Sequence, residues 1–233
     1  MNQGPWDHGT FTEKLREVGA SSYHDKHPFH VLMNSGKLGR EGIQAWVANR
    51  FYYQVNIPIK DAAIISNCPL RDVRRLWLHR IIDHDGTQGD EGGIGAWLRL
   101  GEACGLSRDE MLAHRRVVPG VRFAVDAYVN LARTQPWPIA VASSLTELFA
   151  PDLMAQRLDA FERFYPWVEQ AGLEYFKGRV TQARRDSGEA LTLTLMHCVT
   201  RDMQEAAVRA LRFKCDLLWA MLDSIQGATP AVM

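Results

Sequence analysis

The stretch WVANRFYYQVNIPIKDAAIISN, residues 46–67, decides the fold of this chain. Its apolar residues occur on nearly every face of a helix, and this pattern is typical of a helix buried inside a helical protein. The same stretch contains four residues that do not suit a buried helix: Arg50, Gln54, Lys60 and Asp61. Because buried charges are costly unless they are paired, the sequence predicts a central helix whose polar side chains have partners inside the protein.

The hydrophobic pattern elsewhere also follows the helical period, and the alternation of Val, Ile and Thr that marks strands is missing. Helix ends are well marked: Pro69 opens a segment that stops at Gly86, and Ser107 and Glu110 have the spacing of a capping box. No linker or low-complexity segment divides the chain, so we expect one all-α domain over residues 1–233. The other expected helices are residues 10–18, 40–65, 92–104, 120–135, 138–149, 158–184, 188–199 and 201–226.

Two prolines fall inside expected helices. Pro58 lies within the 40–65 segment, where it should kink the helix and free the carbonyl group near Gln54. The pair Tyr165-Pro166 should bend or split the 158–184 segment. Since kinks often border cavities, a cavity near either position is expected.

The charge balance and the cysteine pattern exclude several classes of protein. The 27 Lys and Arg residues equal the 27 Asp and Glu residues, so overall charge gives no reason to expect nucleic acid or an anionic membrane as partner. No apolar run reaches the ~18 residues that cross a bilayer, and the first residues do not resemble a signal peptide, so we expect a cytoplasmic protein. The four cysteines are scattered without a CxxC pair, which favours buried, reduced thiols over disulfides or a zinc site.

Polar residues recur at helical spacing on otherwise apolar segments. For any single pair the common explanation is a solvated helix face or a salt bridge in the core. Taken together, the pairs favour a bundle that folds its polar stripes inward around a cavity rich in cations. Because Arg binds carboxylates bidentately and stays charged when buried, such a cavity would suit a small polyanion. The residues of this pattern are Arg50 and Gln54, Arg80 and His84, and Tyr175 and Arg179, with Thr146, Glu147 and Lys214 on other segments.

Two motifs suggest a metal site without supporting one. YHDKHPFH, residues 23–30, contains three histidines, but Pro28 pushes His27 out of helical geometry, so we interpret them as caps, turn residues or a single substrate contact. DHDGTQGDEGG, residues 83–93, lacks the glycine position and the closing Glu of an EF-hand and is interpreted as a helix-capping loop. The Glu-x-x-His pairs of di-iron bundles and the common cofactor motifs are absent too, so no metal site is expected.

Seven segments taken together resemble the pyrroloquinoline-quinone synthase family. The resemblance runs in register from about residue 20 to about residue 223, and motifs of this length are far more specific than any short pattern. The segments are YHDKHPFH (23–30), WVANRFYYQVNIPIKDAAI (46–64), RIIDHDG (80–86), GGIGAWLRLGEA (92–103), PGVRFAVDAY (119–128), SSLTELFAP (143–151) and YPWVE (165–169), the last followed by Tyr175, Phe176 and Arg179.

The resemblance implies an all-α bundle of the haem-oxygenase-like or TenA-like type, usually a homodimer. It implies an enzyme that closes a ring in a bicyclic precursor and oxidises it by eight electrons, with O2 as acceptor, H2O2 as product and no metal or redox cofactor. Substrate and quinone product would carry several carboxylates, which would explain cations on buried stripes. In some family members the last segment continues further than it does here. This chain could therefore be a shortened form or one domain of a fused protein.

Matching positions imply two groups of site residues. Around the place where oxygen reacts, His84 would move protons near neutral pH, Tyr175 would donate a hydrogen bond, and Arg179 would stabilise reduced oxygen. One position departs from the family, in which a histidine takes the place of Met154; a thioether cannot transfer a proton. The residues that would bind the substrate are His24, Arg50, Tyr53, Gln54, Lys60, Arg80, Tyr128, Thr146, Glu147, Arg157 and Lys214.

Three alternatives stay open at this point. A metal-dependent oxidase on the same scaffold would recruit His24, His84 and Glu147 as ligands. A carrier would bind a polyanionic quinone without converting it, since a fold and a pocket do not establish a reaction. A TenA-like thiaminase would need a cysteine nucleophile in the pocket, and none of the four cysteines lies on the polar stripes.

Overall fold

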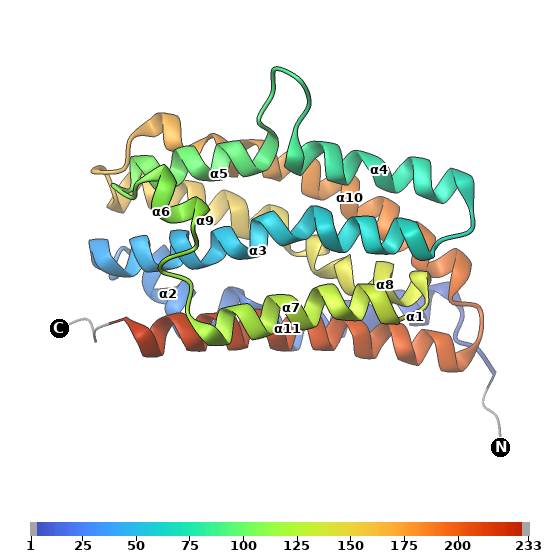
Figure 1. Ribbon diagram of the computed structural model, residues 1–233. Helices are drawn as coiled ribbons and strands as arrows, with labels where there is room; N and C mark the ends of the chain where they lie inside the picture. The colour runs from blue at the N-terminus through green and yellow to red at the C-terminus, as the bar shows by residue number, and fades with distance from the viewer. Residues whose placement is uncertain (1–3, 230–233) are drawn as a thin grey trace.

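Residues 46–67 belong to helix α3 (Arg40–Asn67), which runs through the middle of a helical bundle (Figure 1). The computed structural model describes residues 4–229, with the side chains in that range except those of Thr181 and Arg184. Within this range the only strand-like feature is an isolated bridge between Thr87 and Asp90, so the prediction of an all-α fold is confirmed. The other elements are α1 (His8–Ser22), η1 (His24–Lys26), α2 (Pro28–Asn34), α4 (Arg71–Asp85), α5 (Gly92–Ala103), α6 (Arg108–Leu112), α7 (Pro119–Thr134), α8 (Trp137–Ala142), η2 (Ser143–Leu148), α9 (Ala150–Phe164), η3 (Gln170–Leu173), α10 (Glu174–His197) and α11 (Arg201–Ala228).

The long helices lie along a common direction around α3. Helices α4 and α5 follow one another along one side of α3, and the loop between them projects from the bundle (Figure 1). Helix α7 packs on another side of α3 and also against α11, while α10 packs against α9, η2 and α8. None of the described helices is long and apolar enough to span a membrane. Because α3 and α11 share α7 as a neighbour, and α10 and α11 share η2, the helices α3, α10 and α11 all contribute side chains to the same interior.

Several helix boundaries follow the signals in the sequence. Helix α4 ends at Gly86, whose φ of 82° is a conformation that favours glycine, and α6 begins with the predicted capping box of Ser107 and Glu110. Tyr165 leaves helical geometry before Pro166 and ends α9, so the expected split is confirmed. Helix α3 continues through Pro58, which is tolerated although its ring nitrogen cannot donate to the carbonyl of Gln54.

Other boundaries differ from the prediction. Helix α2 was not expected; Pro28 starts it, with the His27 side chain accepting from the Phe29 amide as an N-cap. Residues 138–149 are not one helix, because α8 gives way to the 3-10 turn η2, and α9 begins at Ala150 rather than at residue 158. The break expected between residues 184 and 188 is absent, since α10 is continuous there and the ion pairs of Asp186 hold its polar side chain inside the bundle.

The core consists of two apolar clusters, and polar residues mark the boundary between them. On α3 the first cluster ends at Tyr53 and the second begins at Ala63, while on α11 the change falls between Cys215 and Leu217. Gln54, Lys60 and Asp61 of α3 and Lys214 of α11 are buried at this boundary. The four cysteines are buried and free, as expected. A layer of buried polar side chains therefore separates the two apolar clusters, and the candidate site lies in this layer.

Candidate active site

A narrow polar pocket lies at this boundary, with a cavity volume of about 60 Å³. Its wall is built from the end of α1, η1, α3, η2, α9, α10 and α11, so segments from the whole length of the chain meet there. Apolar wall residues include Met154, so the position at which the family has a histidine does face the site. The predicted residues on the wall are His24, Arg50, Tyr53, Thr146, Glu147, Tyr175 and Arg179.

Three buried cations near the pocket already have carboxylate partners. One Arg80 nitrogen donates to both oxygens of Glu147 at 2.6 Å, and Arg80 also lies 3.6 Å from Asp61. Burial opposes its charge, but these carboxylates outweigh burial and raise the pKa of Arg80. Lys60 lies 2.5 Å from Asp61, and Arg179 lies 3.4 Å from Glu147. These residues therefore form salt bridges in the core.

Three other cations have no carboxylate within ion-pair distance among the described residues: Arg50, Arg157 and Lys214. Lys214 donates to the Tyr53 hydroxyl at 2.6 Å, and its ammonium lies 3.6 Å from the centre of the Tyr128 ring. Arg157 lies over Trp46 and 3.2 Å from the His30 ring nitrogen, and Arg50 stacks on Tyr53 at 3.9 Å. These three side chains therefore form a cluster of basic groups that has no carboxylate partner in the described part of the chain.

Burial affects the protonation of these groups directly. It lowers the pKa of Arg157 to about 9, with the charge of Arg50 as the next cause, and it holds the pKa of Lys214 well below its usual range. The rings of His24 and His30 lie 4.8 Å apart at an angle of 55°, and burial together with the neighbouring cations holds the pKa of each ring well below 6.5. Both histidines are neutral at pH 7. An anion placed among these groups would reverse the shifts, because it would stabilise their charged forms.

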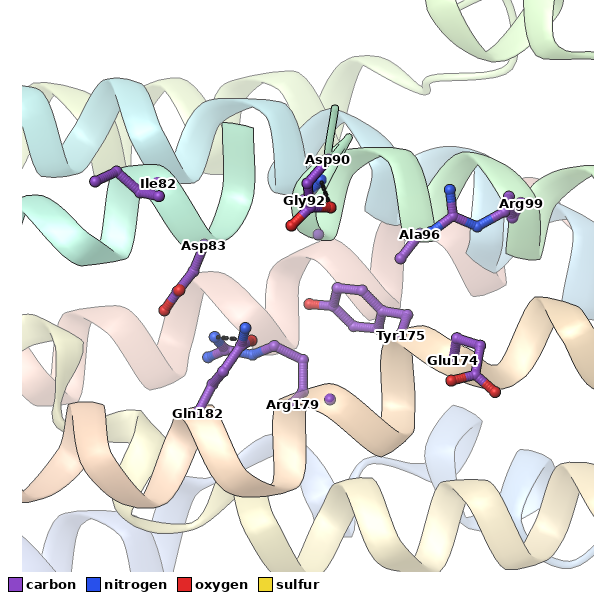
Figure 2. A pocket seen from close by; sticks show the side chains of 12 residues that line it. Ile82, Asp83, Asp90, Gly92, Ala96, Arg99, Glu174, Tyr175, Arg179 and Gln182 are labelled. Atoms are coloured by element: carbon purple, nitrogen blue, oxygen red, sulfur yellow. Dashed lines mark hydrogen bonds between the residues drawn. The ribbon is translucent and has the colours of Figure 1, made fainter. Parts of the chain in front are cut away.

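The three residues expected around oxygen lie close together but have different surroundings. Tyr175 and Arg179 face the central pocket from α10, and both also face an outer cavity beside α4 and α5, which Figure 2 shows. His84 lies behind this wall; its Nδ1 contacts the Arg80 carbonyl at 3.0 Å, while its buried Nε2 has no hydrogen-bond partner among the described residues. Burial, followed by the charge of Arg179, lowers the pKa of His84 to about 3. His84 is therefore a neutral base and does not titrate near pH 7.

The remaining predicted residues form a layer behind the wall. Gln54 is buried, and its side-chain oxygen has no partner among the described residues. Tyr128 lies beneath Lys214, and burial raises its pKa. Sequence reasoning missed Asp186, because the run RRDSG resembles a helix break, although Asp186 lies 3.4 Å from Arg179 and 3.7 Å from Arg80. His30 was also missed as a site residue, and its only signal was its place in the YHDKHPFH motif.

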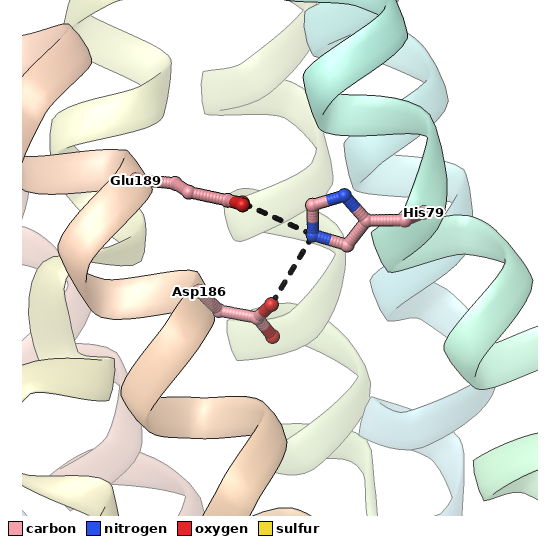
Figure 3. A group of neighbouring side chains, drawn as sticks. All are labelled: His79, Asp186 and Glu189. Atoms are coloured by element: carbon pink, nitrogen blue, oxygen red, sulfur yellow. Dashed lines mark ion pairs between the residues drawn. The ribbon is translucent and has the colours of Figure 1, made fainter.

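Groups that could hold a metal ion lie elsewhere. His27 turns away from the other two histidines of its motif and contacts Asp223 at 3.1 Å. In the described part of the chain the one group with suitable spacing is His79, Asp186 and Glu189, which Figure 3 shows, and not His24, His84 and Glu147. Asp186 in this group already accepts two hydrogen bonds from Arg185 on one oxygen, and its other oxygen faces Arg80 and Arg179, so we interpret the group as an ion-pair network.

The cysteines do not supply a nucleophile to the pocket. None of the four, all of which lie in the described range, is on its wall. Burial raises the pKa of Cys215 to about 11 and that of Cys104 and Cys198 to about 12, so these thiols stay protonated. The arrangement does not match what a thiaminase nucleophile requires.

Comparison with known proteins agrees with this geometry. The model of the TENA/THI-4/PQQC family matches residues 12–224. A pyrroloquinoline-quinone synthase of Pseudomonas aeruginosa strain LESB58 is 57% identical over 228 residues, covering 98% of this chain and 91% of that protein. A pyrroloquinoline-quinone synthase of Ectopseudomonas mendocina is 56% identical over the same length and coverage.

Solved structures share the fold at low sequence identity. A domain with a haem-oxygenase-like fold from Shewanella denitrificans superposes with a TM-score of 0.79 at 13% identity, covering 95% of this chain and 93% of that one. A TenA homologue from Pseudomonas syringae gives 0.77 at 11% identity, covering 97% and 98%. The expected haem-oxygenase-like or TenA-like bundle is confirmed. The chain therefore belongs to the TENA/THI-4/PQQC family and, within it, to the group of the pyrroloquinoline-quinone synthases.

Proposed function

We propose that this protein catalyses the ring closure and eight-electron oxidation of a bicyclic precursor to pyrroloquinoline quinone, with O2 as acceptor and H2O2 as product. In this proposal the enzyme uses no metal or redox cofactor, is cytoplasmic and acts as a homodimer. The names of relatives at 56–57% identity support the reaction class. The basic side chains in and around the pocket support a substrate that carries several negative charges.

One observation carries the proposal: Arg50, Arg157 and Lys214 lie close to one another, and none of them has a carboxylate partner among the described residues. Arg157 and Lys214 are buried and Arg50 is half-buried. Leaving a charge buried and unpaired destabilises a protein, so this arrangement is explained best by a ligand that supplies the anions. A guanidinium binds a carboxylate through two parallel hydrogen bonds, and an ammonium binds it as a point charge. A flat molecule with several carboxylates is the matching ligand.

The pocket must widen when this ligand binds. Its volume of about 60 Å³ is below the roughly 300 Å³ at which small-molecule sites begin. Ala150 and Met154 form one part of the pocket wall and belong to α9. Because α9 is preceded by the short 3-10 turn η2 and not by a long helix, its first turn can move more easily than the other parts of the wall. We therefore place the opening movement at the start of α9.

Tyr175 and Arg179 are positioned for the oxidative steps. Electron transfer to O2 develops negative charge, and the guanidinium of Arg179 on the pocket wall would stabilise it. The Tyr175 hydroxyl would donate a hydrogen bond to the same oxygen species. His84 is neutral, and its Nε2 has no hydrogen-bond partner in the part of the chain that the structure describes, so it can accept a proton once the substrate carboxylates raise its pKa.

The direct test mixes purified protein, the bicyclic precursor and O2, and follows quinone absorbance, oxygen consumption and peroxide. Catalytic turnover with peroxide formation is expected, and it should survive treatment with a chelator. Tight binding of the quinone without conversion of the precursor would instead show a carrier. Activity that a chelator removes and stoichiometric iron or copper restores would show a metal-dependent oxidase.

A further inference from the structure

Two outer cavities flank the central pocket, and each shares side chains with its wall. The first, which we call the α1 cavity, has a volume of about 340 Å³, lies between α1 and the end of η2, and shares Tyr23 with the pocket. The second, which we call the α5 cavity, has a volume of about 280 Å³ and shares Tyr175 and Arg179 with the pocket (Figure 2). Tyr23 therefore lies between the pocket and the α1 cavity, and Tyr175 and Arg179 lie between the pocket and the α5 cavity.

The α1 cavity has a positive balance of charge. Its charged residues are two cations, Arg16 and Lys26, and one acid, Asp25. Both cations are exposed, and neither has a carboxylate within ion-pair distance in the described part of the chain; Lys26 donates to the Ala20 carbonyl instead. Free cations at the mouth of a cavity attract anions from solution.

The α5 cavity has the opposite balance. Its charged residues are three acids, Asp83, Asp90 and Glu174, and two cations, Arg99 and Arg179. Most of these charges are already paired: Arg99 with Glu91 at 2.9 Å, Glu174 with Lys177 at 2.9 Å, and Asp83 with Arg185. Arg179 is paired with Glu147 and Asp186. In the described part of the chain this mouth therefore offers a polycarboxylate no unpaired cation, whereas neutral O2 and H2O2 need none.

The partition between the α1 cavity and the pocket is a pair of aromatic rings held against a glycine. The Phe149 ring rests on Gly19 of α1 so closely that a Cβ at that position would lie 1.9 Å from a ring carbon. The rings of Tyr23 and Phe149 lie 5.4 Å apart, and the ring of Tyr23 meets that of His24, on the pocket side, at 4.5 Å. Phe149 lines the α1 cavity and packs against Tyr23, which lines both the cavity and the pocket, so movement of these two rings would connect the two spaces.

We propose that the α1 cavity is the access site for the polycarboxylate ligand, where Arg16 and Lys26 hold it before it passes Phe149. This inference rests on the proposed function, since it takes the same ligand. Arg16 and Lys26 at the mouth increase the rate at which the ligand meets the protein. Arg50, Arg157 and Lys214 then replace them as partners of the ligand carboxylates. The α5 cavity remains for the small neutral reactants.

The test measures the association of pyrroloquinoline quinone by stopped-flow at low ionic strength. Arg16→Glu and Lys26→Glu should each lower the association rate constant about 10-fold, and the difference should shrink as salt is added. Arg99→Glu is the matched control, because it makes the same charge change at the α5 cavity, and it should have little effect. An equal loss in all three variants would indicate net charge alone, and a loss confined to Arg99→Glu would place access at the α5 cavity; either result overturns the proposal.

A second variant tests the partition. Phe149→Ala should raise the association and dissociation rate constants of the quinone together, because it lowers a barrier without removing a partner of the bound ligand. Unchanged rate constants would show that the ligand does not pass this ring. If the unaltered protein binds and converts its substrate while these variants behave as the control does, only the access proposal fails; if the unaltered protein binds no quinone, the proposed function fails.

Discussion

Among single residues, Lys214 and Arg80 are both buried cations, but they differ in their partners. Lys214 contacts a phenol and an aromatic ring, whereas Arg80 is held by Glu147 and Asp61. Removing a buried cation that has anionic partners leaves those anions uncompensated, while removing an unpaired one relieves a desolvation cost. The contrast separates residues that serve the fold from residues that serve a ligand.

The contrast predicts opposite effects on stability. Arg80→Met should lower the free energy of unfolding by about 3–5 kcal/mol, and Lys214→Met should leave it within about 1 kcal/mol of the unaltered protein or raise it. Methionine keeps a similar side-chain volume in both cases, so packing changes little. Urea unfolding of the ligand-free proteins gives the measurement. A loss of several kcal/mol in Lys214→Met would mean that Lys214 has a structural anion as partner.

The sequence predicted which residues are polar and buried, but it could not say which of them are paired. Spacing of four residues correctly joined Tyr175 to Arg179 on one helix face, because that relation is local. The pairing of Arg80 with Glu147 spans 67 residues and that of Lys214 with Tyr53 spans 161, and both depend on how the helices pack. Tertiary contacts, which no local pattern encodes, decide this part of the site.

Among the helices, α10 connects the pocket with the ion-pair network outside it. Tyr175, Arg179 and Asp186 are spaced by four and seven residues, so they lie on one face of the helix. Asp186 is buried and lies 3.4 Å from Arg179. Glu189 is less buried, and its ion-pair partner among the described residues is the partly exposed His79. We expected separate helices over 158–184 and 188–199, but α10 is continuous here, and Asp186 packs inside the bundle against three arginines.

Asp186 should therefore position Arg179 without touching the substrate. Asp186→Asn should retain quinone binding within a few fold but slow the oxygen-dependent phase of a single turnover about 10-fold, because Arg179 loses one of its anionic partners. Glu189→Gln is the matched control and should leave that phase unchanged. Equal kinetics in both variants, or loss of quinone binding in Asp186→Asn, would show that Asp186 has no such role.

In the whole molecule, buried neutral histidines make stability depend on pH. The pKa of His24, His30 and His84 is lower in the folded protein than the ordinary 6.5, and for His84 it is about 3. Below pH 6.5 the unfolded chain therefore binds more protons than the folded one, so the free energy of unfolding must fall as the pH falls. The carboxylates titrate lower, with usual values near 4, and add little above pH 5.

Unfolding measured between pH 7 and pH 5 should lose stability with a slope of up to about 1.4 kcal/mol per pH unit for each such histidine. His24→Gln should reduce the slope, because it removes one titrating group from the unfolded chain. The measurement is a set of urea transitions at fixed pH values. A slope that is flat above pH 5, or one that His24→Gln does not change, would indicate that these rings are protonated in the folded protein.

The central claim is that unpaired interior cations bind a polycarboxylate. The most direct test is a calorimetric titration of pyrroloquinoline quinone into the protein in two buffers of different ionisation enthalpy. The ligand carboxylates should raise the lowered pKa values of Lys214 and the buried histidines. We expect one quinone per chain, net proton uptake on binding, affinity that falls as pH rises, and a loss of about 1–3 kcal/mol in Lys214→Met. Absence of binding, or binding without proton uptake and with equal affinity in Lys214→Met, would contradict the claim.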